Sequence, residues 1–132
     1  MDRTFFDTAF AKLNPSQRSV VESIYGSYMV VAGPGTGKTQ VLGARTAHIL
    51  LSTDIAPDNI LITTFTDAGV AAIKKRLFAF IGAASYRVHV TTLHALASDI
   101  ITTYPEYFLK YRALRAMDDL EGYEIIEEIL KA

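Results

Sequence analysis

Cysteine is absent from all 132 residues, which excludes disulfide bonds, thiolate metal sites and thiol nucleophiles. Long apolar runs are absent too. No stretch of about 18 apolar residues occurs, so we expect no transmembrane helix and no membrane partner. The first residues, MDRTFFDTAFAKLN, contain no basic segment followed by an apolar one, so we expect no signal peptide. These absences together favour a cytoplasmic protein.

An excess of charge of one sign is also missing, because 13 basic residues face 14 acidic ones and the formal net charge is −1. A domain that binds nucleic acid by itself usually carries a basic excess. Any contact with nucleic acid must therefore be local, or shared with other domains. Half of the residues are apolar and a fifth are charged, which is typical of one globular domain with a real core.

Predicted strands alternate with predicted helices along the chain. Short apolar runs rich in β-branched residues predict buried strands at 28–32, 60–64 and 87–92. Apolar spacing and capping residues predict helices at 14–25, 40–51, 67–81, 93–104 and 118–131. This alternation predicts an α/β fold with a parallel sheet that helices cover on both faces.

The strongest functional signal is the segment VVAGPGTGKT at residues 30–39. Its glycines let backbone N–H groups approach a triphosphate without a Cβ clash. Lys38 would place a positive charge on the β- and γ-phosphates, and the Thr39 hydroxyl is suited to Mg²⁺. The strict pattern has a glycine where this chain has Ala32, another small residue. Lys38 and Thr39 are therefore the candidate catalytic residues, and the candidate nucleotide contacts are Ala32, Gly33, Pro34, Gly35, Thr36, Gly37, Lys38, Thr39 and Gln40.

A phosphate loop identifies a nucleotide site but not a reaction. The segment LNPSQRSVV at residues 13–21 lies upstream and resembles the Q motif of UvrD/Rep-like superfamily 1 DNA helicases. The resemblance implies that Gln17 reads the adenine edge of ATP, since a carboxamide donates and accepts hydrogen bonds at once. Taken alone, Gln17 would more often be a solvated helix residue, and its spacing before the phosphate loop favours adenine recognition.

Two further segments resemble the same family. ILITTFTDAGVAAIKKRL at residues 60–77 resembles motif Ia, which implies that Phe65 stacks on a base of single-stranded DNA while Thr64 and Thr66 contact its backbone. VTTLHALA at residues 90–97 resembles motif Ib, which implies that Thr92 and His94 also lie against the DNA backbone. The implied partner is single-stranded DNA or a single/double-strand junction. Aromatic stacking is worth about 1–3 kcal/mol per base and tolerates any sequence.

Both segments depart from the family pattern. Asp67 and Ala68 stand where the family usually has Asn and Lys, and Leu93 and Ala95 replace Phe and Ser. Three basic residues that follow could supply phosphate contacts or form a solvated helix face: Lys74, Lys75 and Arg76. Three other residues match no catalytic or DNA-binding position and are interpreted as structural: Arg45, by packing or ion pairing, His48 and His89.

The resemblance implies a truncated three-layer RecA-like P-loop NTPase core with a parallel sheet. Residues 1–108 would be a partial ATP-binding domain (1A), and residues 109–132 the helical start of subdomain 1B. Family members carry an acidic motif later in the chain and arginines on a second RecA-like domain. Without these missing helicase domains, we expect this chain to bind ATP weakly and not to unwind DNA. The apolar side of the tail helix should then be exposed, or be buried by a second copy of the chain: Ile125, Ile126, Ile129 and Leu130.

Other hypotheses stay open at this point. A small P-loop phosphotransferase would need an arginine-rich lid, and no obvious lid follows the third predicted strand. A nucleic-acid-binding module with an idle phosphate loop is disfavoured by the net charge of −1. A helicase-nuclease of the RecB/AddA type and an RNA helicase remain compatible with these segments.

Overall fold

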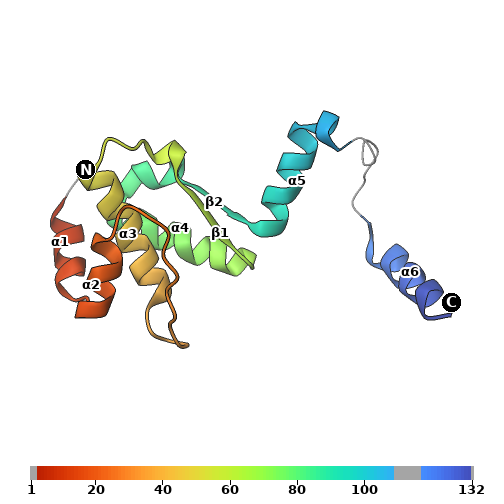
Figure 1. Ribbon diagram of the computed structural model, residues 1–132, viewed down its shortest axis with the longest axis horizontal. Coiled ribbons are helices and arrows are strands. Elements are labelled where there is room, and N and C mark those ends of the chain that lie inside the picture. The colour runs from red at the N-terminus through yellow and green to blue at the C-terminus, as the bar shows by residue number, and fades with distance from the viewer. Residues whose placement is uncertain (1–2, 109–116, 132) are drawn as a thin grey trace. The chain divides into compact units, whose positions relative to one another are not determined.

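The computed structural model describes residues 3–108 and 117–131. Contacts divide the chain into two compact units, Met1–Leu96 and Ala97–Ala132. The helices are α1 (Arg3–Ala11), α2 (Pro15–Glu22), α3 (Lys38–Ser52), α4 (Asp67–Ile81), α5 (Leu93–Thr103) and α6 (Asp119–Lys131), as Figure 1 shows. The strands are β1 (Leu61–Thr64) and β2 (His89–Thr92), and the short 3₁₀ helices are η1 (Pro57–Asn59), η2 (Gly82–Arg87) and η3 (Pro105–Tyr107).

Helix α2 begins where its capping residues predict. The Asn14 side chain accepts a hydrogen bond from the Gln17 backbone N–H, and the Gln17 side chain accepts one from the Asn14 N–H. Pro15 occupies the first helical position, where its missing N–H costs nothing. These reciprocal bonds satisfy two backbone donors and set the start of the helix.

Helix α1 has no counterpart among the predicted elements. Phe6 and Phe10, four residues apart, stack at 5.5 Å between ring centroids. The His48 ring of α3 lies parallel to both, at 6.0 Å from Phe6 and 6.4 Å from Phe10. Packing against α3 therefore stabilises a short helix that would be marginal by itself, and the structural interpretation of His48 is confirmed.

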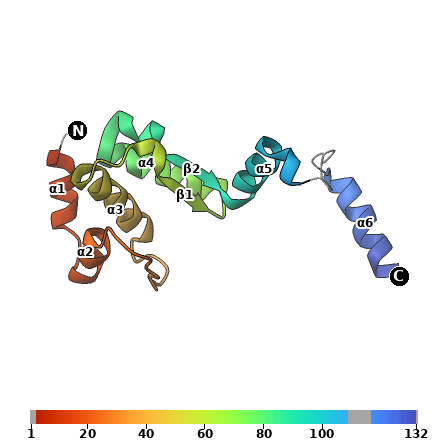
Figure 2. The same cartoon turned by 45° about the horizontal axis from the view of Figure 1, so that its top comes forward.

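The sheet consists of β1 and β2, which pair in parallel in a register that runs from Leu61–His89 to Thr64–Thr92. Helix α4 connects them, and the two strands lie side by side in both views (Figures 1 and 2). Ile62 and Val90 point to the buried face, while Leu61 and His89 are exposed. Among the described residues the core lies on only one face of this two-stranded sheet, and a sheet covered by helices on both faces stays a prediction.

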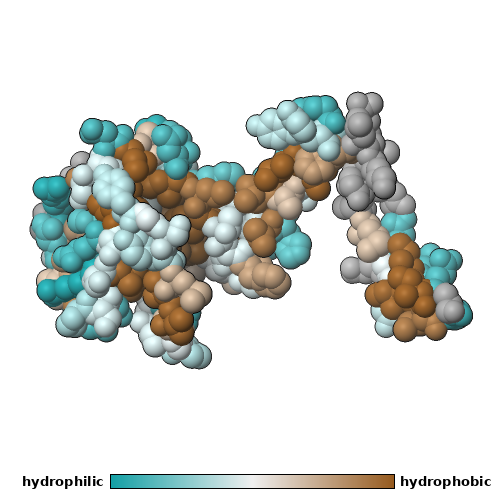
Figure 3. Space-filling view, in the orientation of Figure 1, coloured by the Kyte–Doolittle hydropathy of each residue, from teal (hydrophilic) through white to brown (hydrophobic). Residues whose placement is uncertain are grey.

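The predicted strand at residues 28–32 is also wrong. The segment forms neither helix nor strand, and its residues from Tyr28 to Val31 are exposed. Figure 3 shows hydrophobic surface on this loop between α2 and α3. A strand needs a partner for its backbone groups, and in the part of the chain that the structure describes, β1 and β2 pair only with each other. The apolar pattern alone could not create that partner.

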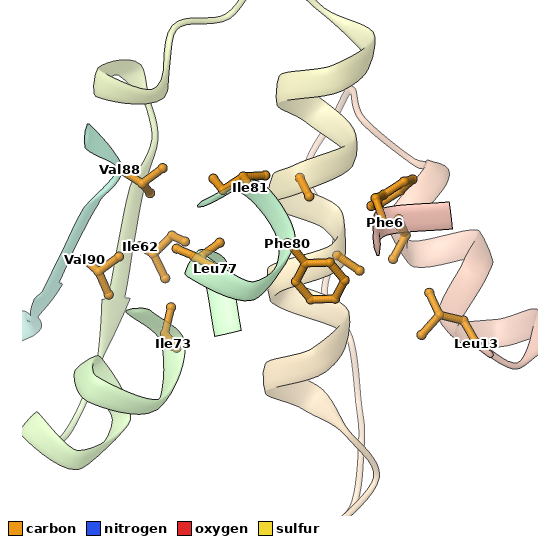
Figure 4. Close-up of a cluster of buried hydrophobic side chains, with 12 residues drawn as sticks. Phe6, Leu13, Ile62, Ile73, Leu77, Phe80, Ile81, Val88 and Val90 are labelled. Carbon is orange, nitrogen blue, oxygen red and sulfur yellow. The ribbon is translucent and has the colours of Figure 1, made fainter. Parts of the chain in front are cut away.

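Helix α4 supplies the centre of the core in the first unit. Ile73, Leu77 and Ile81 lie on the stripe that faces the strands, and Leu77 is fully buried. Figure 4 shows these side chains between the strands and α3. Phe80 turns toward α1, where its ring lies 6.5 Å from that of Phe6. Burial of this stripe fixes which face of α4 looks outward.

The second unit contains α6, whose exposed large apolar side chains are Leu120, Tyr123, Ile125, Ile126, Ile129 and Leu130. Figure 3 shows hydrophobic surface on this helix. The apolar side of the tail helix is thus exposed in the single chain, and its burial by a second copy stays a prediction. Among the described residues, every helix falls short of the length and hydropathy that crossing a bilayer requires.

Candidate functional site

The loop before α3 has the backbone that its glycines predict. Gly35 has φ of 72° and Gly37 has φ of 81°, in the left-handed region that other residues rarely adopt. Gly37 is the N-cap of α3, so the loop passes directly into the N-terminus of that helix. A Cβ on Gly37 would lie 3.5 Å from the Gln17 side-chain nitrogen. Helix α2 and the loop are therefore in direct contact.

Lys38 holds this loop together. Its Nζ donates to the Gly33 carbonyl oxygen at 2.6 Å and to the Ala32 oxygen at 3.3 Å. The Thr36 hydroxyl donates to the same Gly33 oxygen at 2.8 Å. An ammonium group has one more N–H than these two contacts use. The lysine thus shapes the loop while keeping a donor for an anion.

Gln17 joins α2 to the loop through a pair of bonds that we call the Gln17 clamp. Its Oε1 accepts from the Asn14 N–H at 3.1 Å, and its Nε2 donates to the Thr36 carbonyl oxygen at 3.1 Å. If the carboxamide were flipped, its NH₂ group would face the Asn14 N–H and its oxygen would face the Thr36 carbonyl oxygen, and neither pair could form a hydrogen bond. The clamp therefore fixes the orientation of the carboxamide. Each of the two atoms keeps one hydrogen-bonding position unused by the described residues.

A cavity of about 680 Å³ lies beside this loop, within the range of small-molecule sites. Gln17, Thr36 and Lys38 contribute polar groups to it, and its apolar wall consists of Val20, Tyr28, Val30, Val31, Val41 and Leu42. Sequence reasoning missed that the exposed valines would line a cavity, because it placed them in a buried strand.

Arg45 also lines this cavity. Its guanidinium donates to the Val20 carbonyl oxygen at 2.6 Å and lies 5.2 Å from the centre of the Tyr28 ring. Arg45 therefore ties α3 to the end of α2 and orients Tyr28. The interpretation of Arg45 as a packing residue is confirmed, and its partners are backbone oxygens and a ring. No local sequence signal could have identified Tyr28 as its partner.

A second surface forms where the two strands end. Because Thr64 pairs with Thr92 in the parallel register, the residues that follow each strand meet. The rings of Phe65 and His94 lie 5.8 Å apart at 71°, and Phe65 is 75% exposed. The two segments that resemble motifs Ia and Ib therefore share one surface.

The threonines of this surface also begin helices. Thr66 accepts from the Gly69 N–H at 3.1 Å and caps α4, and Thr92 accepts from the Ala95 N–H at 3.1 Å at the start of α5. Each hydroxyl still has its own hydrogen to donate. A Cβ on Gly69 would lie 2.5 Å from the Thr64 hydroxyl oxygen. The glycine thus allows Thr64 to pack closely against the first turn of α4.

A model of the UvrD/REP helicase N-terminal domain matches residues 13–132. The chain therefore belongs to the UvrD/REP helicase N-terminal domain family, which implies a P-loop helicase fold. The chain is 30% identical over 119 residues to the ATP-dependent DNA helicase PcrA of Bacillus subtilis (strain 168), a match that covers 90% of this chain and 16% of that protein. The PcrA protein of Staphylococcus aureus (strain Mu50 / ATCC 700699) is 28% identical over 119 residues, with the same coverage of 90% and 16%. The chain thus spans about 16% of the length of these relatives.

Proposed function

We propose that this chain is the ATP- and single-stranded-DNA-binding N-terminal part of an ATP-dependent DNA helicase, which as a whole couples ATP hydrolysis to translocation and unwinding. One observation carries the proposal. Gln17 from α2 and Lys38 from α3 meet on the same glycine loop, at the carbonyl oxygens of Thr36 and Gly33. The names of the PcrA relatives support it.

The phosphate end of ATP would be held by the loop and the N-terminus of α3. A Cβ at Gly35 would meet no atom within 4 Å, so the loop is open there to a phosphate group. Lys38 would neutralise the β- and γ-phosphates with the donor that the loop leaves unused. Thr39 would hold Mg²⁺, which supplies charge neutralisation in phosphoryl transfer. The backbone from Ala32 to Gln40 would contribute the remaining contacts, at Gly33, Pro34, Gly35, Thr36 and Gly37.

The adenine end would be read by Gln17. The Gln17 clamp leaves one acceptor on Oε1 and one donor on Nε2. Adenine offers the complement, an N6–H donor beside the N7 acceptor, whereas guanine offers acceptors at both O6 and N7. A fixed carboxamide cannot rotate to suit guanine. The clamp therefore favours ATP over GTP.

Single-stranded DNA would bind at the surface where β1 and β2 end. Phe65 would stack on a base, since its ring is mostly exposed and held edge-on by His94. Thr64, Thr66, Thr92 and His94 would contact the DNA backbone. A duplex adjoining this strand, as at a single/double-strand junction, would be engaged by other parts of the whole protein.

We assign residues 1–108 to a RecA-like domain 1A of three layers, and residues 109–132 to the start of subdomain 1B; residues 109–116 lie outside the described part. The acidic motif and the arginines of hydrolysis would come from other parts of the whole protein. By itself, this chain would bind ATP weakly and would not unwind DNA.

The test is competition of ATP and GTP against a fluorescent ATP analogue with Mg²⁺. Wild type should prefer ATP by about tenfold or more, because a buried unpaired acceptor costs about 1–3 kcal/mol. Lys38→Ala should weaken all binding at least about tenfold, and Gln17→Ala should remove the preference for ATP. Lys131→Ala is the matched control, because Lys131 pairs with Glu127 on α6. Equal competition by GTP in wild type, or a Lys38→Ala protein that binds like Lys131→Ala, would refute the assignment.

A further inference from the structure

The outward face of α4 carries two cations and one member of an aromatic pair. Lys74, Lys75 and Phe78 are exposed on this helix, and the Phe78 ring lies 5.7 Å from that of Tyr86 in η2. Phe78 is 51% and Tyr86 is 78% exposed. We call these four residues the aromatic–basic patch. It lies away from the glycine loop's cavity, whose walls include none of them.

Helix geometry brings the two lysines next to Phe78. They precede it by four and three residues, the two spacings that make side chains neighbours at about 5–6 Å between Cβ atoms. Helical side chains lean toward the N-terminus, so the Phe78 ring leans over the turn that carries Lys74 and Lys75. The cations and the aromatic pair therefore form one continuous surface.

The two lysines of this patch, Lys74 and Lys75, are unpaired in the part of the chain that the structure describes. The one acid of α4 is Asp67 in its first turn, about 10 Å from the lysines along the helix axis. Asp58, which approaches η2, is already paired with Arg87. The patch is thus locally basic although the chain as a whole carries a net charge of −1.

We propose that the aromatic–basic patch is a binding surface for single-stranded nucleic acid, separate from the surface at Phe65. Unpaired lysines select a polyanion and would contact its phosphates. Exposed ring faces select unpaired bases, which can stack on them whatever their sequence. A duplex hides its base faces and would use only the lysines. The site needs neither the glycine loop nor Phe65. It therefore adds a second contact with single-stranded nucleic acid to those of the proposed function.

The chain contains a matched control for the aromatic pair. Tyr104 and Tyr107 have rings 6.5 Å apart and are 51% and 79% exposed, almost the same exposures as Phe78 and Tyr86. Glu106 lies between them in the sequence. Tyr86→Ala and Tyr107→Ala therefore remove equally exposed tyrosines, one from the patch that contains Lys74 and Lys75 and one that follows Glu106.

The first experiment is fluorescence anisotropy of a labelled oligo-dT of about 15 nucleotides, a length that spans typical single-strand sites. Tyr86→Ala should weaken the Kd about 5- to 150-fold, the range that corresponds to loss of one stacked base. Tyr107→Ala should leave the Kd within about twofold. The same Tyr86 effect should persist in a Phe65→Ala background. Thermal melting of each variant confirms that its fold is retained.

The second experiment tests the lysines through salt. The double variant Lys74→Ala/Lys75→Ala should reduce the slope of log K against log salt by about 1.4, since each single-strand phosphate contact contributes about 0.7. Lys131→Ala, which removes a lysine already paired with Glu127, should leave the slope unchanged. Binding of a duplex of the same length should be weakened by the lysine double variant but not by Tyr86→Ala.

Each contrary result overturns the proposal. It is wrong if wild type does not bind the oligonucleotide at low salt, if Tyr86→Ala behaves like Tyr107→Ala, or if the salt slope does not change. It is also wrong if Tyr86→Ala changes sedimentation but not oligonucleotide binding, since the patch would then join two copies of the chain. Failure of the ATP competition would refute the nucleotide site and leave this result untouched.

Discussion

Gln17 shows how one side chain can serve two parts of the molecule. Its position in the sequence allows either a solvated helix residue or an adenine contact. The structure excludes the first alternative, because Oε1 bonds to Asn14 and Nε2 bonds to Thr36, 19 residues away. Its remaining acceptor and donor have a fixed direction. Adenine recognition stays a prediction, and the orientation of the carboxamide gives that prediction a physical basis.

Asn14 is the residue on which this orientation depends. Asn14→Ala removes the oxygen that caps α2 at the Gln17 N–H, which should lower the free energy of unfolding by about 1 kcal/mol. Fraying of the first turn should also loosen the Gln17 clamp and reduce the preference for ATP over GTP. Urea unfolding and nucleotide competition measure the two effects.

Asn14→Ser is the control for this prediction, because serine restores the cap oxygen. It should recover both stability and base preference. If Asn14→Ala lost stability but kept the full preference for ATP, the clamp would not control base selection.

At the scale of elements, an ion pair joins the segments that lead into the two strands. Arg87, the last residue of η2, donates from Nε to the Asp58 carboxylate of η1 at 3.0 and 3.3 Å, and its Nη2 contacts the same carboxylate. The hydrogen bond from Arg87 holds the pKa of Asp58 below its usual value, and Asp58 raises that of Arg87. The pair therefore holds together the amino ends of β1 and β2.

The Asp58 pKa has a consequence for stability. A carboxyl whose pKa is lowered by folding stabilises the native state above its unfolded pKa of about 3.9, and this contribution disappears as pH falls through the lowered value. The wild-type protein should therefore have a higher melting temperature than Asp58→Asn at neutral pH. This difference in melting temperature should shrink as pH falls below about 4. High salt should also reduce it, because both side chains are more than half exposed. A melting difference independent of pH would contradict this role.

At the scale of the whole molecule, the buried core formed by the described residues lies within the first unit. Leu77 of α4 is fully buried at its centre. Leu77→Ala should lower the free energy of unfolding by about 2–5 kcal/mol, since it removes packed methyl groups and leaves a cavity. Denaturant unfolding of the full chain measures this loss.

Leu120→Ala on α6 is the matched control, because Leu120 is 70% exposed. It should change the free energy of unfolding by no more than about 0.5 kcal/mol. An equal loss from both variants would mean that the apolar face of α6 contributes to stability as much as the core does.

Features that depend on neighbours in the chain were determined by the sequence itself. The Asn14–Gln17 capping box begins α2 near the predicted residue, and α4 occupies the predicted range of 67–81. The two runs that became β1 and β2 were also predicted, as was the glycine loop, in which Gly35 and Gly37 adopt positive φ. Capping, spacing and glycine conformation act over a few residues, so the local pattern is sufficient.

Features that depend on a distant partner were decided only by the tertiary structure. Residues 28–32 have the composition of a strand but lack a partner strand among the described residues, whereas α1 is a helix because Phe6 and Phe10 stack against His48. The contact between Phe65 and His94 follows from the register of β1 and β2. Backbone pairing and ring packing join residues far apart in the chain, and no local pattern specifies which ones meet.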